Sequence, residues 1–485
     1  MNSRCFASLS KSNLVHNAKV IKSLAPKSKI VAILKANGYG HGIRSVSKYL
    51  DKEIDIFGVS SVAEGLIIKN LNPKKRVVLM QGILSQSDLK IAIDNELEVA
   101  IHTSQHLDWL EIISKSHKIH NQFWFKLNTG MNRLGFSYKP FNLSEILSYS
   151  SSHASSNIKA STSHLDIRKE KRFADQAQIL IPILKCKNNN FACKETSCTC
   201  IANHQCEIAK LSTHGGSIEN ISSEVEQLNF KQHKDKQHEA GTFTTHSGSI
   251  HGGPIENISS EVEQLNSTKN NFYRLQGMTS KAPIIFSHFA CADNISDPLN
   301  FIQIRNFEDF ALRENENELS LCNSAGILNF PEYHFDYVRP GLMLYGISPI
   351  SNISAQQLDL KPVLQLESVL IAKQKISPGE SVGYSRRFVA EKNMTIGIVG
   401  FGYGDGYKFV INKGFVNIKG NLCRIIGSIS MDLTIVDISD INCEIGDPVI
   451  LIGEGINANN CADYFGTHSW DIIANIQNRV KFEWV

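Results

Sequence analysis

The chain has 485 residues, of which 42% are hydrophobic and 20% are charged. This length exceeds what one hydrophobic core usually supports, so we expect two or three structural units. The 50 basic and 47 acidic side chains leave a formal net charge of +3, which gives no electrostatic reason to expect a nucleic acid or an anionic membrane as partner. The N-terminal segment has no apolar core of signal-peptide length, and no apolar run is long enough to span a membrane. We therefore expect a cytoplasmic protein.

The eleven cysteines are an odd number and are unevenly spread. Five lie between Cys186 and Cys206, with spacings that match no standard zinc-binding pattern, so we predict no metal site. We expect the other six to be reduced thiols, as in an enzyme of a reducing compartment. These six are Cys5, Cys291, Cys322, Cys423, Cys443 and Cys461.

Short apolar runs alternate with helix-like stretches over residues 1–150, and the same alternation resumes over 282–354. Near-continuous apolar strands that alternate with helices are typical of parallel strands buried on both faces. We therefore predict a (β/α)8 barrel of the TIM type, built from these two parts of the chain.

Residues 151–281 interrupt this pattern and are rich in Ser, Asn, His and Lys. They contain an internal repeat, HGGSIENISSEVEQLN at 214–229 and HGGPIENISSEVEQLN at 251–266, whose copies differ only at Ser217 and Pro254. Two copies are fewer than a solenoid needs, so we interpret the repeat as a duplicated sequence element. The composition predicts an irregular or disordered insertion within the barrel.

Residues 355–485 have a third character. Short apolar runs such as MTIGIVGFGYG and DPVILIGEG are separated by Gly, Asp and Asn. Such spacing is typical of short strands joined by turns, and it predicts a mostly β C-terminal domain.

Lys35 is the first candidate for chemistry, because it follows the apolar strand IVAIL and precedes a glycine-rich turn. In a β/α barrel, the carboxyl end of a strand opens into the active site. A lysine backed by apolar side chains is partly desolvated, so it loses its proton more readily and can form a Schiff base. Taken alone, the pattern is more often that of a strand-end lysine that merely reaches water.

Seven motifs, in the same order along the chain, resemble those of the alanine racemases. They are LKANGYGHG (34–42), FKLNTGMNRLGF (125–136), SHFACAD (287–293), LCNSAG (321–326), VRPGLMLYG (338–346), PGESVGYSRRF (378–388) and SISMDL (428–433). The resemblance covers roughly residues 1–150 and 282–485. It implies pyridoxal 5'-phosphate as cofactor and a homodimer with shared active sites.

The resemblance also implies a role for individual residues. Lys35 would carry the cofactor and act as the base on one face of the substrate, while Tyr384 from the second subunit would act on the other face. Lys126 matches a lysine that is often carbamylated in this family. Substrate contacts are implied for Arg133, Met431 and Asp432. Further cofactor contacts are implied for Tyr39, Arg133, His288, Asn323, Ser324, Arg339, Gly341, Leu342 and Trp470.

Three positions bear on the chemistry that the resemblance implies. Arg339 would face the pyridine nitrogen, and an arginine cannot accept the ring proton. The cofactor would then be a weaker electron sink, which favours racemization over transamination. Trp470 stands where the family usually has a tyrosine that donates to the phosphate, and Asn128 stands where it often has an aspartate. The indole N–H of a tryptophan is a donor only, and it lies at a different distance from the backbone than a tyrosine hydroxyl. We therefore expect that the protein could retain the cofactor more weakly.

The implied function is the interconversion of L-alanine and D-alanine, which supplies D-alanine for peptidoglycan. Arg339 and the Tyr384 motif argue against the alternative of a barrel-type amino-acid decarboxylase. The β domain argues against a non-catalytic pyridoxal-binding barrel. The sequence leaves open a decayed racemase, and it leaves open alanine or serine as the preferred substrate.

The position of the insertion predicts its effect on activity. It follows an expected helix at 141–150 and precedes an expected strand at 283–290. Helix-to-strand connections lie on the barrel face opposite the active site, and long surface loops cost little closure entropy. We therefore expect activity to survive deletion of residues 152–280.

Overall fold

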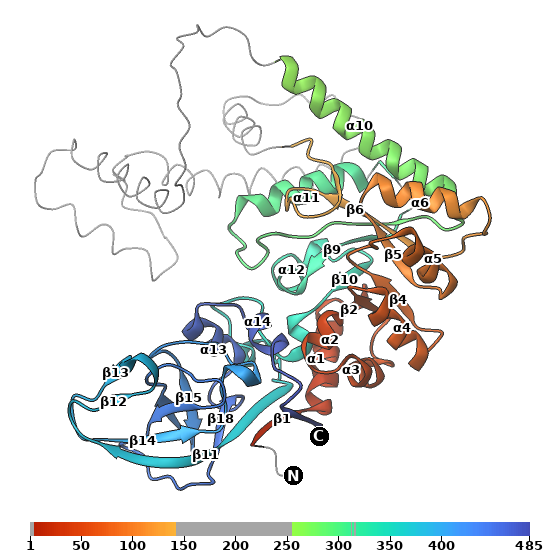
Figure 1. The fold of residues 1–485 in the computed structure, drawn as a ribbon. Coiled ribbons are helices and arrows are strands. Elements are labelled where there is room, and N and C mark those ends of the chain that lie inside the picture. The colour runs from red at the N-terminus through yellow and green to blue at the C-terminus, as the bar shows by residue number, and fades with distance from the viewer. Residues whose placement is uncertain (1–3, 142–254, 312, 315–316) are drawn as a thin grey trace, which may run out of the picture. The chain divides into compact units, whose positions relative to one another are not determined.

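The computed structural model describes residues 4–141, 255–311, 313–314 and 317–485 (Figure 1). The described residues up to 141 and from 259 onward belong to one compact unit. Within these ranges, no helix combines the length and apolar character needed to cross a membrane.

Eight parallel strands close into a barrel, which confirms the predicted (β/α)8 fold. In ring order they are β2 (Lys29–Ile33), β3 (Ile56–Val59), β4 (Arg76–Leu79), β5 (Glu98–Ile101), β6 (Phe123–Asn128), β8 (Ile284–Phe286), β9 (Leu319–Asn323) and β10 (Tyr337–Arg339). β10 returns to β2 and closes the ring, with Val338 opposite Ile30. The short strand β7 (Phe136–Ser137) pairs in parallel with β6 and is not part of the ring.

The strands of the barrel are buried on both faces. β3 and β5 are buried along their whole length, as expected for strands that are covered by helices outside and filled with side chains inside. Trp124 lies in the barrel interior with its ring 5.1 Å from that of Tyr337 and 5.7 Å from that of Phe286. The barrel is therefore a packed core rather than a pore.

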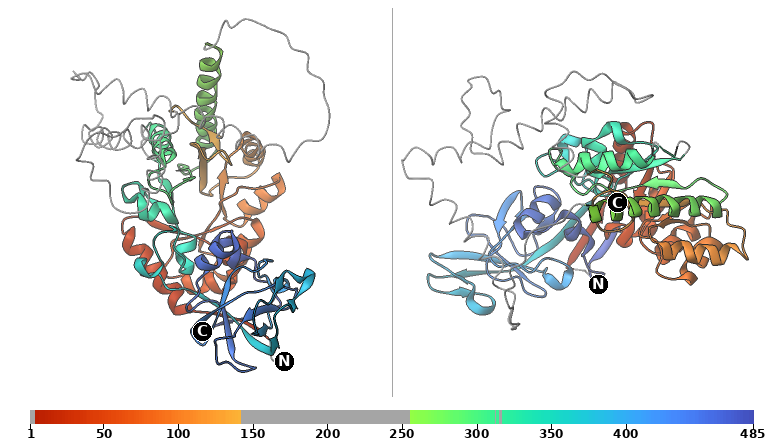
Figure 2. Two further views of the ribbon diagram at one scale, coloured as in Figure 1. Left: turned by 90° about the vertical axis from the view of Figure 1, so that its left-hand side faces the viewer. Right: turned by 90° about the horizontal axis from the view of Figure 1, so that it is seen from above.

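Helices cover the outside of the barrel (Figure 2). They are α1 (Lys11–Leu24), α3 (Ile43–Leu50), α4 (Val62–Leu71), α5 (Gln86–Asp94), α6 (Ser104–Ser114), α10 (Ile255–Met278), α11 (Pro298–Ala311) and α12 (Ser324–Asn329). Four of these helices begin after a Ser or Thr whose hydroxyl accepts a first-turn N–H, namely Ser10, Ser61, Ser85 and Thr103. Such caps satisfy backbone groups that have no partner inside the helix.

Helix α10 lies inside the range 151–281 that the composition assigned to an irregular insertion. Phe272 and Leu275 on this helix are fully buried. The Phe272 ring lies 5.2 Å from Phe125 of β6 and 5.5 Å from Phe310 of α11. The barrel therefore resumes well before residue 282. Sequence composition hid this helix because most of its positions are polar and only a narrow stripe is apolar.

This helix also changes the expected position of the insertion. The described chain stops after β7 at Phe141 and resumes with α10, which leads into β8. The expectation that the insertion directly precedes the strand at 283–290 is therefore wrong, because α10 stands between them. The helix expected at 141–150, the first repeat copy at 214–229 and the cluster Cys186–Cys206 lie outside the described residues.

The C-terminal domain is mostly β, as predicted. Its central strand, β11 (Leu364–Ile376), pairs with β1 (Cys5–Leu9), β14 (Met394–Val399) and β18 (Pro448–Ile452). β1 also pairs in parallel with β19 (Lys481–Trp484). The N-terminal strand therefore belongs to the β domain, whereas sequence analysis placed it with the barrel. The remaining elements are β12 (Ser381–Val382), β13 (Phe388–Val389), β15 (Phe415–Ile418), β16 (Asn421–Arg424), β17 (Thr434–Asp437), α13 (Ala458–Phe465) and α14 (Ser469–Ala474).

An ionic network spans the amino ends of the barrel strands. The Arg76 guanidinium donates to both carboxylate oxygens of Glu98, with Nε–Oε1 at 2.5 Å and Nη2–Oε2 at 3.2 Å. The Trp124 indole also donates to Glu98, at 2.7 Å. The Tyr337 hydroxyl accepts from Arg76 at 3.2 Å and donates to Glu318 at 2.7 Å. The network thus joins several strands at the end of the barrel opposite the carboxyl ends.

Replacing Glu98 by alanine should lower the free energy of unfolding by about 2 kcal/mol, because it leaves the charged guanidinium and the buried indole N–H without their acceptor. Urea unfolding followed by circular dichroism measures this. Lys90→Ala is the control, since Lys90 pairs with Asp94 on an exposed helix face and such pairs contribute about 0.5 kcal/mol or less. Equal losses in the two variants would contradict a stabilising network.

Candidate functional site

The predicted site residues of the barrel gather at the carboxyl ends of its strands. Lys35 follows β2, Lys126 lies on β6, His288 follows β8, Ser324 follows β9 and Arg339 ends β10. This is the end of a β/α barrel at which loops build an active site. These groups are close enough to influence one another electrically, since the charges of Lys35, Lys126 and Arg339 all lower the pKa of His288.

Lys35 opens a short turn of unusual backbone conformation, α2 (Lys35–Tyr39). Ala36, Asn37 and Tyr39 have φ angles of 53°, 55° and 52°. A left-handed conformation costs an L-residue about 1–2 kcal/mol, so the turn must be held by its surroundings. Backbone strain of this kind concentrates at functional sites, where neighbouring contacts maintain it.

The surroundings of Lys35 favour its neutral amine. Burial lowers the pKa of Lys35 below its ordinary value, and the nearby Arg133 guanidinium lowers it further. The Glu64 carboxylate opposes both effects. Because the neutral amine is the form that attacks a carbonyl carbon, the site suits Lys35 for covalent attachment of an aldehyde.

Lys126 has the more strongly perturbed amine. Its side chain is buried, and burial together with the charges of Arg133, Arg339 and Lys35 lowers its pKa to about 7. Carbamylation requires a neutral amine, so a low pKa is the property that this modification needs. The turn after Lys126 is shaped by Asn128, whose Oδ1 accepts the N–H of Asn132 at 2.9 Å.

The pKa of Lys126 can be tested by pulse labelling. In bicarbonate-free buffer, the acetylation of Lys126 by a brief pulse of acetic anhydride should be half-maximal near pH 7, because the neutral, reactive amine is present above the pKa and is lost below it. Peptide mass spectrometry reads each lysine separately, and exposed Lys392 provides the reference profile. Identical profiles for the two lysines would contradict the predicted perturbation.

Arg339 and His288 lie in contact at the barrel mouth, where Arg339 is buried and His288 is partly buried. Arg339 donates to Ser320 Oγ, to the carbonyls of Ser287 and Leu321, and to His288 Nδ1 at 3.3 Å. Arginine has donors only, so His288 Nδ1 accepts and the imidazole is neutral. Burial and the Arg339 charge hold the pKa of His288 well below its usual range. Burial lowers the pKa of Arg339 to about 10, so it remains protonated at neutral pH.

A cluster of hydrogen-bonding groups suited to an anion lies beside Lys35. The Gly341 N–H donates to Ser324 Oγ at 2.8 Å. A Cβ on Gly341 would lie 2.8 Å from Tyr39 Oη, so only glycine lets these groups approach one another. Burial raises the pKa of Tyr39 to about 12, which keeps its hydroxyl a donor. Asn323 instead caps α12, accepting the Gly326 N–H at 2.9 Å.

Other predicted residues lie on the C-terminal domain and are exposed. Tyr384 is 74% exposed and Met431 is 53% exposed. Tyr384 lies in the turn between β12 and β13, where Ser385 and Arg386 have positive φ angles of 54° and 49°. The Tyr384 side chain therefore points toward solvent and does not pack into the core of its own subunit. Leu342, by contrast, is buried beside Gly341 at the barrel mouth.

Asp432 binds two arginines, Arg4 and Arg479, that lie in none of the seven motifs. Its Oδ1 accepts from Arg4 Nη2 at 2.7 Å and from Arg479 Nη2 at 2.5 Å. Arg479 also binds the buried Asp405, with Nε–Oδ1 at 2.9 Å. These bonds hold the pKa of Asp432 below its usual range. They attach the loop of Met431 and Asp432 to segments at both ends of the chain.

Trp470 lies on α14, and this helix packs against the turn that carries Lys35. The Trp470 ring stacks on His468 with centroids 4.3 Å apart, and its side chain is 46% exposed. A Cβ on Gly40 would lie 2.5 Å from the carbonyl oxygen of Ile473. The α14 backbone therefore fits against the lysine turn, even though the indole itself faces outward.

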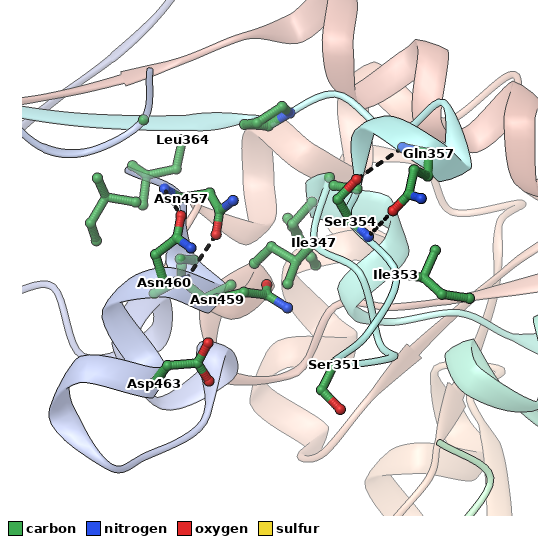
Figure 3. A pocket seen from close by; sticks show the side chains of 18 of the residues that line it. Ile347, Ser351, Ile353, Ser354, Gln357, Leu364, Asn457, Asn459, Asn460 and Asp463 are labelled. Atoms are coloured by element: carbon green, nitrogen blue, oxygen red, sulfur yellow. Dashed lines mark hydrogen bonds between the residues drawn. The ribbon is translucent and has the colours of Figure 1, made fainter. Parts of the chain in front are cut away.

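A separate pocket of about 280 Å³ lies behind the lysine turn, where His41 and α13 contribute to its lining (Figure 3). Figure 3 shows Ser354 paired with Gln357 and Asn457 paired with Asn460. These polar side chains satisfy one another and cap local turns. None of the predicted site residues lines this pocket, so we place the site at the barrel mouth.

Comparisons with known protein families give matches over most of the chain. The model described as alanine racemase, N-terminal domain, matches residues 9–203 and 263–349, and the model described as alanine racemase, C-terminal domain, matches 363–484. An alanine racemase of Vesicomyosocius okutanii is 28% identical over 478 residues, covering 98% of this chain and 97% of the relative. One of Aliivibrio salmonicida is 27% identical over 482 residues, covering 99% and 98%.

Solved structures show the same similarity. The alanine racemase of Acinetobacter baumannii has a TM-score of 0.69 at 26% identity, and each chain is covered completely. The biosynthetic alanine racemase of Pseudomonas aeruginosa has a TM-score of 0.68 at 25% identity with the same coverage. The alanine racemase of Bartonella henselae, described with covalently bound pyridoxal phosphate, has a TM-score of 0.66 at 19% identity over the full length of both chains, and its likeness shows the fold alone.

Proposed function

Because this chain belongs to the alanine racemase family, we propose that it interconverts L-alanine and D-alanine with pyridoxal 5'-phosphate as cofactor. The observation that carries the proposal is Lys35, a lysine of lowered pKa at the barrel mouth. The reaction needs such a lysine, since the cofactor is an aldehyde. The D-alanine formed would supply peptidoglycan synthesis.

The barrel mouth has the positive charge and the hydrogen-bond donors that this anionic cofactor needs. Arg133 and Arg339 bring positive charge to the place where the anionic cofactor would lie. Tyr39, Ser324 and the backbone N–H groups of Gly341 and Leu342 would hold the phosphate. When bound, the cofactor would withdraw electrons from the substrate α-carbon and so acidify its C–H bond.

The residues of the chain supply the proton transfers and the positioning. Lys35 would hold a proton at Nζ on one face of the substrate, and Tyr384 from a second copy of the chain would hold one at Oη on the other. Two bases on opposite faces allow one proton to leave as another arrives. Arg133 and the loop of Met431 and Asp432 would receive the substrate carboxylate.

Arg339 supports racemization over decarboxylation and transamination. It stays protonated and has no acceptor atom, so it would hydrogen-bond the pyridine nitrogen without protonating it. The cofactor would then withdraw electrons less strongly, which would favour prompt return of a proton to the α-carbon from Lys35 or Tyr384. Its four bonds to the barrel hold the guanidinium in place for this contact.

The homodimer is supported by the exposed residues of the β domain. Tyr384 and Met431 are both large apolar or aromatic side chains with more than half of their surface exposed. A shared active site would place them against the barrel mouth of the partner, where they would be buried. The same site in an isolated subunit would lack its second base.

The test combines turnover with cofactor trapping on the full chain. Purified protein with added pyridoxal phosphate should convert L-alanine to D-alanine and the reverse, as read by chiral chromatography, with L-serine as the competing substrate. Borohydride reduction followed by peptide mapping should label Lys35. A folded protein that carries no label on Lys35 would overturn the proposal, and a labelled protein without turnover would indicate a decayed racemase.

A further inference from the structure

We infer that Glu64 is a positioning residue that ties the strained Lys35 turn to the neighbouring β/α unit and so sets the geometry and charge of the Lys35 amine. The inference rests on the proposed function for its catalytic meaning. Glu64 belongs to α4, which follows β3, whereas Lys35 follows β2. No motif quoted from the family resemblance includes Glu64.

The backbone around Lys35 needs an external tie. Ala36, Asn37, Gly38 and Tyr39 are consecutive residues with φ angles between 52° and 65°. Such a run is unfavourable for L-residues, and it persists only where surrounding contacts hold it. Relaxation of this run to right-handed backbone would rotate the turn and move the Lys35 side chain away from the barrel mouth.

Two amides of the turn bind carbonyls close by in the sequence. The Gly38 N–H donates to the Leu34 carbonyl at 2.8 Å, and the Gly40 N–H donates to the Ala36 carbonyl at 3.0 Å. The Asn37 N–H instead donates to Glu64 Oε1 at 3.2 Å. Glu64 is thus the side chain from outside the turn that binds the amide two residues beyond Lys35.

The second carboxylate oxygen of Glu64 is bound as well. Its Oε2 accepts the Ser60 N–H at 2.9 Å, and the backbone N–H of Glu64 donates to Ser61 Oγ at 3.3 Å. Ser61 and Glu64 stand in the spacing of a helix start signal, but here the carboxylate reaches across to the adjacent strand-end loop. A single carboxylate therefore joins the loops that follow β2 and β3.

The charge of Glu64 acts on the same lysine. Burial and Arg133 lower the pKa of Lys35, and Glu64 is the group that raises it. Lys126 lies in the same cationic cluster, but burial, Arg133, Arg339 and Lys35 are the influences on its pKa. Loss of the Glu64 charge should therefore shift the protonation of Lys35 and leave that of Lys126 nearly unchanged.

Two variants, Glu64→Gln and Glu64→Asp, separate the hydrogen bonds that Glu64 makes to the two loops from the effect of its negative charge on Lys35. A glutamine side chain keeps the length but offers one oxygen in place of two and carries no charge. An aspartate keeps the charge but is one methylene shorter, so it cannot span Asn37 and Ser60. Glu391→Gln, at an exposed position of the β domain, is the matched control.

Two measurements on the full chain test the inference without using turnover. Hydrogen exchange of the peptide over 35–42 should become about tenfold faster in Glu64→Gln and Glu64→Asp, because a hydrogen bond to a charged acceptor is lost. On cofactor-free protein, pulse acetylation of Lys35 should move to lower pH in Glu64→Gln only, since removal of the negative charge lowers the lysine pKa. Lys126 is the internal reference.

Turnover adds a third readout. Racemization should slow by about tenfold to a hundredfold in Glu64→Gln, as expected when a catalytic amine is misplaced by a fraction of an ångström. Unchanged exchange over 35–42 together with an unchanged Lys35 labelling profile would overturn the inference. Because both of these are read without substrate, they remain decisive even if the wild-type chain proves not to be a racemase.

Discussion

Lys35→Ala and Tyr384→Phe should each abolish racemization, and a mixture of the two inactive proteins should recover activity. Each change removes one of two proposed proton-transfer groups, and loss of such a group costs about 10²–10⁴ in rate. Lys35→Ala should lie at the upper end, because it also removes the proposed point of cofactor attachment. Both activities are measured as D-alanine formation from L-alanine.

The recovery follows from the geometry of a shared site. Lys35 lies at the barrel mouth, while Tyr384 is exposed on the β domain, so each active site would use Lys35 of one subunit and Tyr384 of the other. After dissociation and random reassociation of equal amounts, half of the dimers are mixed and each holds one intact site. The expected activity is about one quarter of the wild-type value.

The control is a mixture in which both changes lie on one chain. Lys35→Ala/Tyr384→Phe protein mixed with wild-type protein forms mixed dimers in which each site has lost one of its two residues. Random reassociation should then lower the activity of the wild-type protein to about half, because only one quarter of all dimers remain fully wild type. If the two single variants fail to complement while native mass spectrometry of differently tagged chains shows mixed dimers, Tyr384 does not act across the interface.

Two deletions should differ sharply in their effect on folding. Removal of residues 204–254 should leave a folded, active enzyme, because this range lies outside the family match and ends before α10. Removal of 152–280 should prevent folding, because it deletes α10. Loss of the buried Phe272 and Leu275 alone corresponds to about 5–10 kcal/mol, at typical costs of about 3–5 kcal/mol for a phenylalanine and about 2–5 kcal/mol for a leucine. This is comparable with the whole stability of a domain.

The measurements are solubility, circular dichroism and racemase activity of the two deletion variants. Phe272→Ala in the full-length chain isolates the contribution of α10 and should destabilise by about 3–5 kcal/mol. Tyr273→Ala is the matched control, since the neighbouring ring is half exposed. A folded and active protein after removal of 152–280 would mean that α10 is dispensable and that the original expectation for the insertion was right.

The sequence alone determined the barrel, the β domain and the barrel part of the site. Apolar strands that alternate with helices carry their own signal, because a strand buried on both faces must be apolar throughout. Lys35, His288, Ser324 and Arg339 each stand directly at the end of such a strand, so the topology of a parallel barrel brings them to one mouth. The family resemblance singled these residues out, and their places after the strands predicted that they would share one mouth.

Only the tertiary structure decided the pairing of β1 with the distant β11. Cys5, Ala7 and Leu9 are buried in alternation with less buried neighbours, which is the pattern of a strand with one covered face. A five-residue strand of this kind does not specify which sheet it will join. Its partner is set by the fit of the whole domain.

The same holds for the contacts between segments that are remote in sequence. The pairing of Asp432 with Arg4 and Arg479, and the reach of Glu64 to Asn37, depend on where the loops lie in space. Ion pairs and side-chain hydrogen bonds act over a few ångströms, and no local pattern encodes them. The sequence by itself thus determined which residues carry the proposed chemistry, while the folded structure decided which residues hold them in position.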